Sequence, residues 1–258
     1  MLKPRKSITT QAINWIKDYF KDNPEGKAII GISGGKDSTV TAALCVEALG
    51  KDRVIGVMMP NTTQADIADS AEVCRILDIK SFVIDIGTAY NALSFEIARQ
   101  VCSQAEQPLS ELWNNSLYSS NTPARLRMTA LYSVAALFPN SRVANTCNLS
   151  EDFLGWSTKF GDAAGDFSPL GNLTVREVME IGDDLGIPYW LVHKVPHDGM
   201  CGKTDEDKFG FSYEVLDAFL LDAVMPPKDI YDKIMRMHKA SRHKYTAMPT
   251  FHYNPDIR

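Results

Sequence analysis

A short glycine-rich segment near the N-terminus carries the residue types best suited to chemistry. It reads Ser-Gly-Gly-Lys-Asp-Ser over positions 33–38 and follows directly on the apolar run 27–32. Two adjacent glycines let the backbone turn tightly and approach a ligand, and the N–H groups at the start of a following helix attract anions. Asp37 would repel a bound phosphate unless Mg²⁺ lay between them. The segment therefore predicts a phosphate-binding loop that supplies its own metal ligand.

Two better-known phosphate loops do not match this segment. The pattern G-x-x-x-x-G-K-[ST] requires Gly at position 30 and Ser or Thr at position 37, but the chain has Ile30 and Asp37 there. The dinucleotide pattern G-x-G-x-x-G is absent, so nothing supports a nicotinamide-dependent dehydrogenase. The remaining alternative is a structural glycine turn that ends in a helix cap. The order of apolar run, loop and helix argues against that alternative.

The spacing of apolar residues predicts the elements that must position the loop. Short apolar runs between turn residues indicate buried strands, and runs with helical period indicate helices between them. Strands are expected at 27–32, 54–59, 81–86 and 142–146, and helices at 1–25, 37–49, 64–77, 121–138, 174–185 and 212–222. Strands that alternate with helices form a parallel, doubly wound sheet of the α/β class. We expect a single domain over 1–258, with a nucleotide-binding core at 26–150 and a site-building extension at 151–258.

The composition excludes several classes of protein. The 258 residues are 45% hydrophobic and 23% charged, which is ordinary for a globular protein, and the net charge of −5 argues against non-specific nucleic-acid binding. No apolar run approaches the roughly 20 residues of a membrane helix, and the N-terminus lacks an apolar signal core. The five cysteines form no C-x-x-C pair, so we expect reduced, buried thiols and a cytoplasmic location.

The loop itself resembles that of one enzyme superfamily. S-G-G-x-D-S after a first strand is similar to the pyrophosphate loop of the ATP pyrophosphatases, which include tRNA thiolases and NAD synthetases. The resemblance implies an adenine nucleotide alpha hydrolase-like, Rossmann-like fold. It also implies a reaction in which ATP adenylates a carboxyl or carbonyl oxygen, pyrophosphate leaves, and a nitrogen or sulfur nucleophile then displaces AMP.

Further motifs in the same order along the chain resemble one family within that superfamily. They are N-T-P-A-R-L-R-M at 121–128 with Tyr132, T-C-N-L-S-E at 146–151, S-T-K-F-G-D at 157–162 with Asp166 and Pro169-Leu170, the segment 198–213, and His243-Lys244. Together they are similar to the ammonia-dependent NAD synthetases. The resemblance implies a ligase that uses ATP and ammonia to convert nicotinic acid adenine dinucleotide (deamido-NAD) into NAD, AMP and pyrophosphate, and it implies a homodimer that meets through the helix 121–138.

The resemblance also assigns roles to individual residues. Those expected to bind ATP are Gly31, Ile32, Ser33, Gly34, Gly35, Lys36, Asp37, Ser38, Thr146 and His197. Those expected to bind deamido-NAD are Arg125, Lys159, Asp166, His243 and Lys244. Asp37 and Glu151 are the expected ligands of one Mg²⁺, and together with Asp162 they are the expected catalytic residues. Asp162 would sit beside the adenylate as a buried carboxylate, capture ammonium and accept its proton.

The position of the fourth strand decides whether these residues meet. Ligands of open α/β sheets bind beyond the carboxyl ends of the strands, where the strand order reverses. If the strand at 142–146 lies beside the strand at 27–32, Thr146 and Glu151 emerge next to the loop. Two alternatives stay open: the basic run 236–244 is otherwise a solvated helix face, and Asp162 is otherwise a turn residue after Gly161.

The sequence departs from the family pattern at two positions that the resemblance places near ATP. Val175 stands where a lysine is usual, so we expect Arg176 or Lys203 to substitute for it, and His197 replaces a Thr or Ser after proline. A tRNA thiolase is the rival within the superfamily, disfavoured by the missing C-x-x-C pair and the acidic net charge. A nucleotide-binding protein without turnover is the rival of another class. The length before residue 30 leaves no room for an amidase domain, so free ammonia, or ammonia from a separate protein, is the expected nitrogen source.

Overall fold

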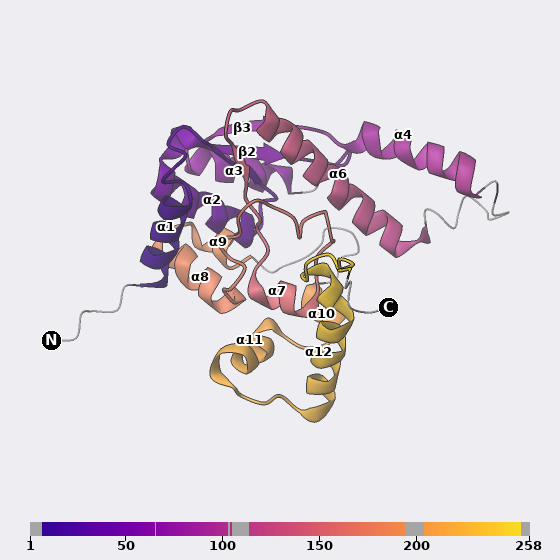
Figure 1. Cartoon of the computed structure of the whole chain (residues 1–258). Coiled ribbons are helices and arrows are strands. Elements are labelled where there is room, and N and C mark those ends of the chain that lie inside the picture. The colour runs from indigo at the N-terminus through magenta and orange to yellow at the C-terminus, as the bar shows by residue number, and fades with distance from the viewer. Residues whose placement is uncertain (1–6, 65, 103, 105–113, 195–203, 254–258) are drawn as a thin grey trace.

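A parallel sheet forms the centre of the molecule, in a computed structural model that describes residues 7–64, 66–102, 104, 114–194 and 204–253 (Figure 1). Its strands are β1 (Ala28–Gly31), β2 (Val54–Met58), β3 (Lys80–Val83) and β4 (Arg142–Val143), in the order β3-β2-β1-β4. All three pairings are parallel, and Ala28 lies opposite Val54 on one side and Arg142 on the other. The predicted α/β class and parallel sheet are therefore confirmed.

The fourth strand is shorter than the predicted 142–146. Only two residues pair as a ladder, and Ala144 then continues as a single bridge to Phe167. The backbone N–H of Asn145 donates to the carbonyl of Phe167 at 2.8 Å, so the chain turns toward the segment 158–168 instead of extending the sheet. The third strand is observed at Lys80–Val83 and not at the predicted 81–86, although the N–H groups of Ile84 and Ile86 still donate to the carbonyls of Met58 and Pro60 at 2.8 and 2.9 Å.

Helices cover both faces of the sheet, as a doubly wound fold requires. The predicted helices correspond to α1 (Ile8–Tyr19), α2 (Lys36–Leu49), α3 (Ile67–Ile76), α6 (Ser116–Ala136), α8 (Val175–Asp184) and α11 (Tyr213–Asp222). The sequence analysis missed α4 (Gly87–Ile97), η2 (Ala98–Cys102), α7 (Leu149–Leu154), α9 (Tyr189–Val192), α10 (Asp205–Phe209), α12 (Lys228–Ser241) and the turns η1 (Lys51–Arg53) and η3 (Arg242–Lys244). Within the described ranges, no helix is long and apolar enough to cross a membrane.

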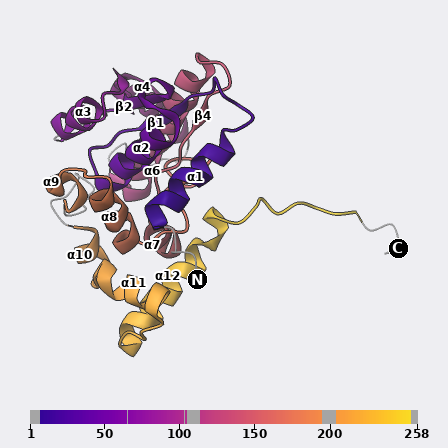
Figure 2. The ribbon, with the colours of Figure 1, turned by 90° about the vertical axis from the view of Figure 1, so that its left-hand side faces the viewer.

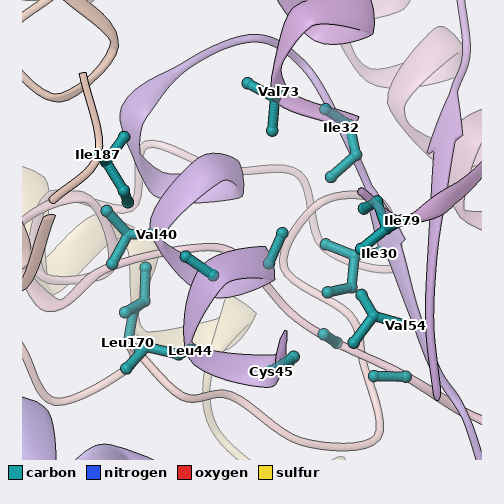
Figure 3. Close-up of a cluster of buried hydrophobic side chains, with 14 of the residues drawn as sticks. Ile30, Ile32, Val40, Leu44, Cys45, Val54, Val73, Ile79, Leu170 and Ile187 are labelled. Atoms are coloured by element: carbon teal, nitrogen blue, oxygen red, sulfur yellow. The ribbon is translucent and has the colours of Figure 1, made fainter. Parts of the chain in front are cut away.

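Alternate residues of β1 enter two different apolar clusters. Ala28 and Ile30 face the cluster built with α1, α2, α3 and α8, part of which is drawn in Figure 3. Ile29 points the other way, into a cluster with Met128 and Leu131 of α6. Because neighbouring side chains of a strand point to opposite faces, this alternation places β1 at the buried centre of the sheet. The loop after β1 is thus held by a rigid strand.

A third apolar cluster joins the C-terminal helices. It contains Leu154 of α7, Val175 of α8, Phe209 of α10, Leu216 of α11 and Ile234 of α12. These helices gather at the end of the molecule away from β3, and α11 and α12 project from it (Figures 1 and 2). Partly buried Met179 of α8 packs against both this cluster and the one on the sheet. The assignment of 1–258 to a single domain stays a prediction.

The docking of α12 on α7 depends on a single glycine. Gly155 caps α7 with φ +72°, and a Cβ built there would lie 1.9 Å from the Cβ of Ser241 at the end of α12. Gly155→Ala is expected to lower the free energy of unfolding by about 3 kcal/mol or more, because backbone must shift to relieve the overlap. Urea unfolding curves measure this loss.

Gly186→Ala is the matched control for this variant. Gly186 also has a positive φ of +67°, but no heavy atom lies within 4 Å of its added Cβ. Its substitution is expected to cost only about 1 kcal/mol, the strain of a left-handed backbone. Equal losses in the two variants would mean that backbone strain alone, and not the close approach to Ser241, explains the effect.

Candidate functional site

The loop after β1 is closed on itself and opens α2. Gly34 has φ +80°, and a Cβ there would lie 3.0 Å from both the Cβ of Asp69 and the backbone nitrogen of Ser70 on α3. The Ser38 hydroxyl donates to the carbonyl of Gly35 at 3.0 Å and accepts from the N–H of Ser33 at 3.3 Å. Gly35 is the N-cap of α2 and offers no side-chain cap. The first turn of α2 therefore presents backbone N–H groups to an anion.

The segment after β4 lies against this loop, because β4 pairs with β1 and so meets the condition stated from the sequence. The amide Nδ2 of Asn148 donates to Oδ1 of Asp37 at 2.9 Å, across 111 residues of sequence. Asn148 also begins α7 in a capping box, in which its Oδ1 accepts from the N–H of Glu151 at 3.0 Å. The same box fixes Glu151 near Asp37. Thr146 lies partly buried in the turn between β4 and α7, where its contact to ATP stays a prediction.

Lys36, Asp37 and Glu151 form a charged cluster at the start of α2. The Lys36 ammonium lies 2.9 Å from Oδ2 of Asp37 and is 5% exposed. Burial raises the pKa of Glu151 well above its ordinary value, the Asp37 charge raises it further, and Lys36 opposes both. Burial alone would lower the pKa of Lys36, but its attraction to Asp37, Glu151 and Asp205 outweighs that effect and raises it. The two carboxylates are therefore held close enough to repel each other.

These two carboxylates suit a divalent cation that is shared with a nucleotide. Two facing acids, one of them with a raised pKa, gain from a positive charge placed between them. Among the residues that the structure describes, no group of three His, Cys, Asp or Glu side chains is arranged to hold a metal. Mg²⁺ commonly takes one or two carboxylates and completes its shell with phosphate oxygens and water. Asp37 and Glu151 fit that pattern.

Asp162 lies in a tight turn at the other end of the site, and its side chain is exposed, not buried as predicted. Its Oδ1 accepts the N–H of Thr158 at 3.0 Å, so the turn role is real. Removal from water by the surrounding protein raises the pKa of Asp162, while the bonds to Thr158 and the Lys244 charge lower it. The Arg127 guanidinium also interacts with this carboxylate. A carboxylate with a raised pKa that solvent still reaches suits proton transfer.

Asn145 and Asn148 are site residues that the sequence analysis did not assign. The Asn145 Nδ2 donates to the carbonyl of Asp162 at 2.7 Å, and its Oδ1 accepts the N–H of Cys147 at 2.9 Å. Asn145 thus ties the turn of Asp162 to the segment that carries Glu151. For Asn148, the capping-box spacing to Glu151 was a usable signal. The sequence pointed to Asn145 only because the resembling pattern usually has glycine at this position.

Three of the five residues predicted to bind deamido-NAD are joined by hydrogen bonds, and a fourth, Lys244, bonds to backbone shortly before Lys159 in the sequence. Arg125 Nε donates to the carbonyl of Lys159 at 3.2 Å, and Lys159 Nζ donates to the carbonyl of His243 at 2.6 Å. Lys244 Nζ donates to the carbonyls of Gly155 and Ser157, each at 2.7 Å. Lys244 is half-buried, and burial lowers its pKa. The alternative of a solvated helix face is therefore wrong for Lys244.

Asp166, the fifth of these residues, has a different setting. Its Oδ2 accepts the N–H of Val143 at 2.7 Å, and the Tyr132 hydroxyl donates to its Oδ1 at 3.1 Å. Burial and the nearby Asp166 charge raise the pKa of Tyr132 to about 12. The carboxylate thus fastens the end of β4 to α6. Its contact to substrate stays a prediction.

The expectation that Arg176 substitutes for a lysine at position 175 changes, and the expectations for two other residues fall outside the described part of the chain. Val175 is buried in the C-terminal cluster, and Arg176 pairs with Asp222 through two bonds of 2.9 and 3.1 Å, so Arg176 is turned to that partner and no longer expected at ATP. His197 and Lys203 lie outside the described residues, as does part of the motif at 198–213, namely 198–203. The rest of that motif includes α10, which Gly210 caps with φ +73°.

The described cysteines behave as predicted. Cys45, Cys74 and Cys147 are free and buried, and burial raises the pKa of Cys45 to about 12. A thiol with such a pKa stays protonated and inert at neutral pH. These three side chains serve packing, which confirms the structural reading for them.

Comparison with known proteins identifies the family. The family model described as NAD synthase matches residues 8–250. The NH3-dependent NAD+ synthetase of Methanocaldococcus jannaschii is 33% identical over 260 residues, which cover 95% of this chain and 96% of the relative. A solved structure of NMN synthetase from Francisella tularensis has a TM-score of 0.82 and 32% identity, covering 95% of this chain and 98% of that one.

A second solved structure supports the same family. The NH3-dependent NAD synthetase of Campylobacter jejuni has a TM-score of 0.71 and 27% identity, covering 95% of this chain and 97% of that chain. The phosphate loop, the neighbouring β1 and β4, and the ordered motifs agree with these likenesses. The chain belongs to the NAD synthase family and is a ligase of its ammonia-dependent type.

Proposed function

We propose that this site adenylates the nicotinate carboxylate of deamido-NAD with ATP and then amidates it with ammonia, giving NAD, AMP and pyrophosphate. The observation that carries the proposal is the bond between Asn148 and Asp37, because it brings the phosphate loop and Glu151 to one place. The loop residues Gly31 to Ser38, Thr146 and His197 bind ATP in this proposal. The free N–H groups of α2 suit its phosphates.

Asp37 and Glu151 would hold Mg²⁺ together with the ATP phosphates. When bound, the ion neutralises charge on the phosphates and the leaving pyrophosphate. The chain itself contributes the loop N–H groups and the fixed positions of the two carboxylates. The Nδ2 of Asn148 donates to Oδ1 of Asp37 and keeps that carboxylate oriented, and the capping box keeps Glu151 in place.

Arg125, Lys159, His243 and Lys244 would receive deamido-NAD together with Asp166. A substrate with a pyrophosphate and a free carboxylate needs cationic partners, and three of these side chains carry a charge at neutral pH. Asp162 interacts with Lys244 and would bind ammonium and accept its proton. Amidation needs that step, because ammonium has no free electron pair.

A mononucleotide acid is the second candidate substrate. The TM-score to the structure titled NMN synthetase is 0.82, against 0.71 and 0.72 for structures titled NAD synthetase. The sequence identity to the NMN synthetase, 32%, is also higher than the 27% and 25% of those two. Nicotinic acid mononucleotide presents the same carboxylate and one phosphate fewer, so the same activation and amidation would apply to it.

A turnover assay tests both candidates. With ATP, Mg²⁺ and ammonium, and with each acid in turn, the enzyme is expected to form AMP, pyrophosphate and the amide in equal amounts. The ratio of kcat/KM for the two acids then decides the substrate. ADP and phosphate as products would contradict the proposal, and so would pyrophosphate release that needs no acid. A tRNA thiolase would release pyrophosphate only with tRNA and a sulfur donor.

We further propose a homodimer in the cytoplasm that meets through α6. Helices α4 and α6 project together from the body (Figure 1), and they expose Phe95 (65%) and Leu137 (77%). An open depression of about 580 Å³ runs along α6 beside Phe160. Exposed apolar area of this kind is typical of an interface. A reducing compartment would keep the described thiols free.

A further inference from the structure

Lys36 is a buried cation inside the loop that must bind an anion. Its side chain is 5% exposed, and its Nζ lies 2.9 Å from Oδ2 of Asp37, which is 18% exposed. The same Nζ lies 6.0 Å from the ring centre of Tyr213, at the start of α11. A buried ammonium is costly unless it has an anionic partner. Here the partner is the carboxylate proposed to ligate Mg²⁺.

Further acidic groups surround this ammonium. Glu151 of α7 and Asp205 of α10 both attract it, so residues from three helices share the one cation. Asp205 is 7% exposed, and Val175, which is buried in the C-terminal cluster, adds no charge there. The cluster is therefore rich in negative charge when no ligand is bound, and Lys36 is the charge that balances it.

Tyr213 brings a buried hydroxyl to the cluster. Its side chain is 4% exposed, and its hydroxyl has no hydrogen-bond partner among the residues that the structure describes. Burial raises the pKa of Tyr213, followed by the charges of Glu151, Asp205 and Asp37, so the hydroxyl lies close to the same acids. Buried hydroxyls are nearly always paired, and an unpaired one points to a missing partner.

Both oxygens of Asp37 already accept protein donors. Oδ1 accepts Asn148 and Oδ2 accepts Lys36. Each oxygen keeps a second lone pair for a metal ion, but an ion bound there would lie close to the Lys36 ammonium and be repelled by its charge. Asn148 is fixed by its own capping box, whereas a lysine side chain is long and flexible and lies at the first turn of α2, beside the phosphate loop. Lys36 is the donor that moves.

We propose that Lys36 is the internal counter-ion of the metal site: it holds Asp37 while no nucleotide is bound, and it turns to the ATP phosphates when Mg²⁺ and ATP enter. The inference rests on the proposed function only in naming ATP as the incoming anion. In this role Lys36 gives the phosphates a positive partner in place of the lysine that the family pattern has at position 175. It also means that the nucleotide-free enzyme binds divalent cations weakly.

Binding of Mn²⁺ to the nucleotide-free enzyme tests the proposal. Electron paramagnetic resonance is used to titrate free Mn²⁺ in the wild type and in Lys36→Met. Loss of one positive charge within about 4 Å of the ion is expected to tighten Mn²⁺ binding by about tenfold or more. Lys51→Met is the matched control, because Lys51 also pairs with an aspartate, Asp78, but on the surface. It should leave Mn²⁺ affinity unchanged.

Two further variants separate charge from packing. Lys36→Arg keeps the charge and should bind Mn²⁺ as weakly as the wild type. Lys36→Gln keeps a donor for Asp37 and should bind more tightly, and it serves if Lys36→Met does not fold. Addition of Mn²⁺ should raise the melting temperature of Lys36→Met or Lys36→Gln more than that of the wild type.

The result that would overturn the proposal is Mn²⁺ binding in both neutral variants that is no tighter than in the wild type. Equal tightening in Lys36→Arg would overturn it as well, since a changed side-chain shape would then be the cause. None of these measurements requires ATP, an acid substrate or turnover. Failure of the proposed function would appear only in the product assay, so the two failures are distinguishable.

Discussion

Replacement of Glu151 by glutamine is expected to slow adenylation by about 10²-fold or more while the fold stays intact, because the phosphates lose one of the two acids that share their cation. Asp37→Asn is expected to act in the same way. The amide keeps the capping box at Glu151, since glutamine serves there as well as glutamate. Pyrophosphate release with ATP and each acid substrate, followed in rapid quench, measures the effect.

Glu177→Gln is the matched control. Glu177 closes the capping box of α8 as Glu151 closes that of α7, through Oε2 and the N–H of Thr174 at 2.8 Å. It should therefore leave adenylation unchanged. Equal activity of Glu151→Gln and the wild type at saturating Mg²⁺ would rule out Glu151 as a metal ligand. Equal losses in Glu151→Gln and Glu177→Gln would assign the loss to helix capping.

The same variant has a consequence for stability. The folded-state pKa of Glu151 lies well above its ordinary 4.5, so the folded protein binds this proton more tightly than the unfolded chain does. The corresponding stability is present below about pH 4.5 and is lost as the pH rises through the raised pKa. In metal-free buffer, urea unfolding at several pH values should show this decline in the wild type and not in Glu151→Gln.

Replacement of Asp162 by asparagine is expected to separate the two half-reactions. Pyrophosphate release in a single turnover should persist, because the phosphate loop and Glu151 are untouched, while formation of the amide should fall by about 10²-fold, the range of a lost general base. The defect should shrink as the pH rises, since free ammonia then replaces ammonium. The wild type should itself lose amidation as the pH falls through the raised pKa of Asp162, because the carboxyl is then protonated.

Asp85→Asn provides the comparison for this variant. Asp85 is also an exposed turn aspartate whose Oδ1 accepts backbone N–H groups, those of Thr62 at 2.9 Å and Gly87 at 2.7 Å. Neither half-reaction should change in it. If Asp162→Asn slows both half-reactions equally at every pH, Asp162 serves binding or turn structure and is not the proton acceptor.

The phosphate loop and the strands themselves were predictable because their signals are local. Gly34 and Asp37 stand in one hexapeptide, and the alternation of apolar runs with helical segments marks each strand by itself. The pairing of β1 with β4 was only a condition at the sequence level, and the structure meets it. The half of the site that is proposed to bind phosphate could thus be anticipated from the sequence.

The rest of the site depends on partners far apart in the chain. Asn148 acts on Asp37 from 111 residues away, and Lys159 meets His243 across 84 residues. No local pattern indicates such pairs. The helix α12 was not predicted because its many basic residues obscure the apolar pattern. Ile230, Ile234 and Met237 recur at helical spacing and pack in the C-terminal cluster. The end of β4 was missed because the bridge from Ala144 to Phe167 is non-local.

We expect the C-terminal apolar cluster to open locally without the sheet. The phosphate loop rests on the buried sheet, whereas Lys244 follows α12 in η3, and Ile234 of α12 packs in the smaller cluster with Phe209 and Leu216. Local opening of that cluster would release Lys244 from the carbonyls of Gly155 and Ser157 while β1 and α2 stayed closed. If Lys244 binds the acid substrate as proposed, that substrate should stabilise α12 against local opening, and slower exchange of its amide hydrogens would then report binding far from the phosphate loop.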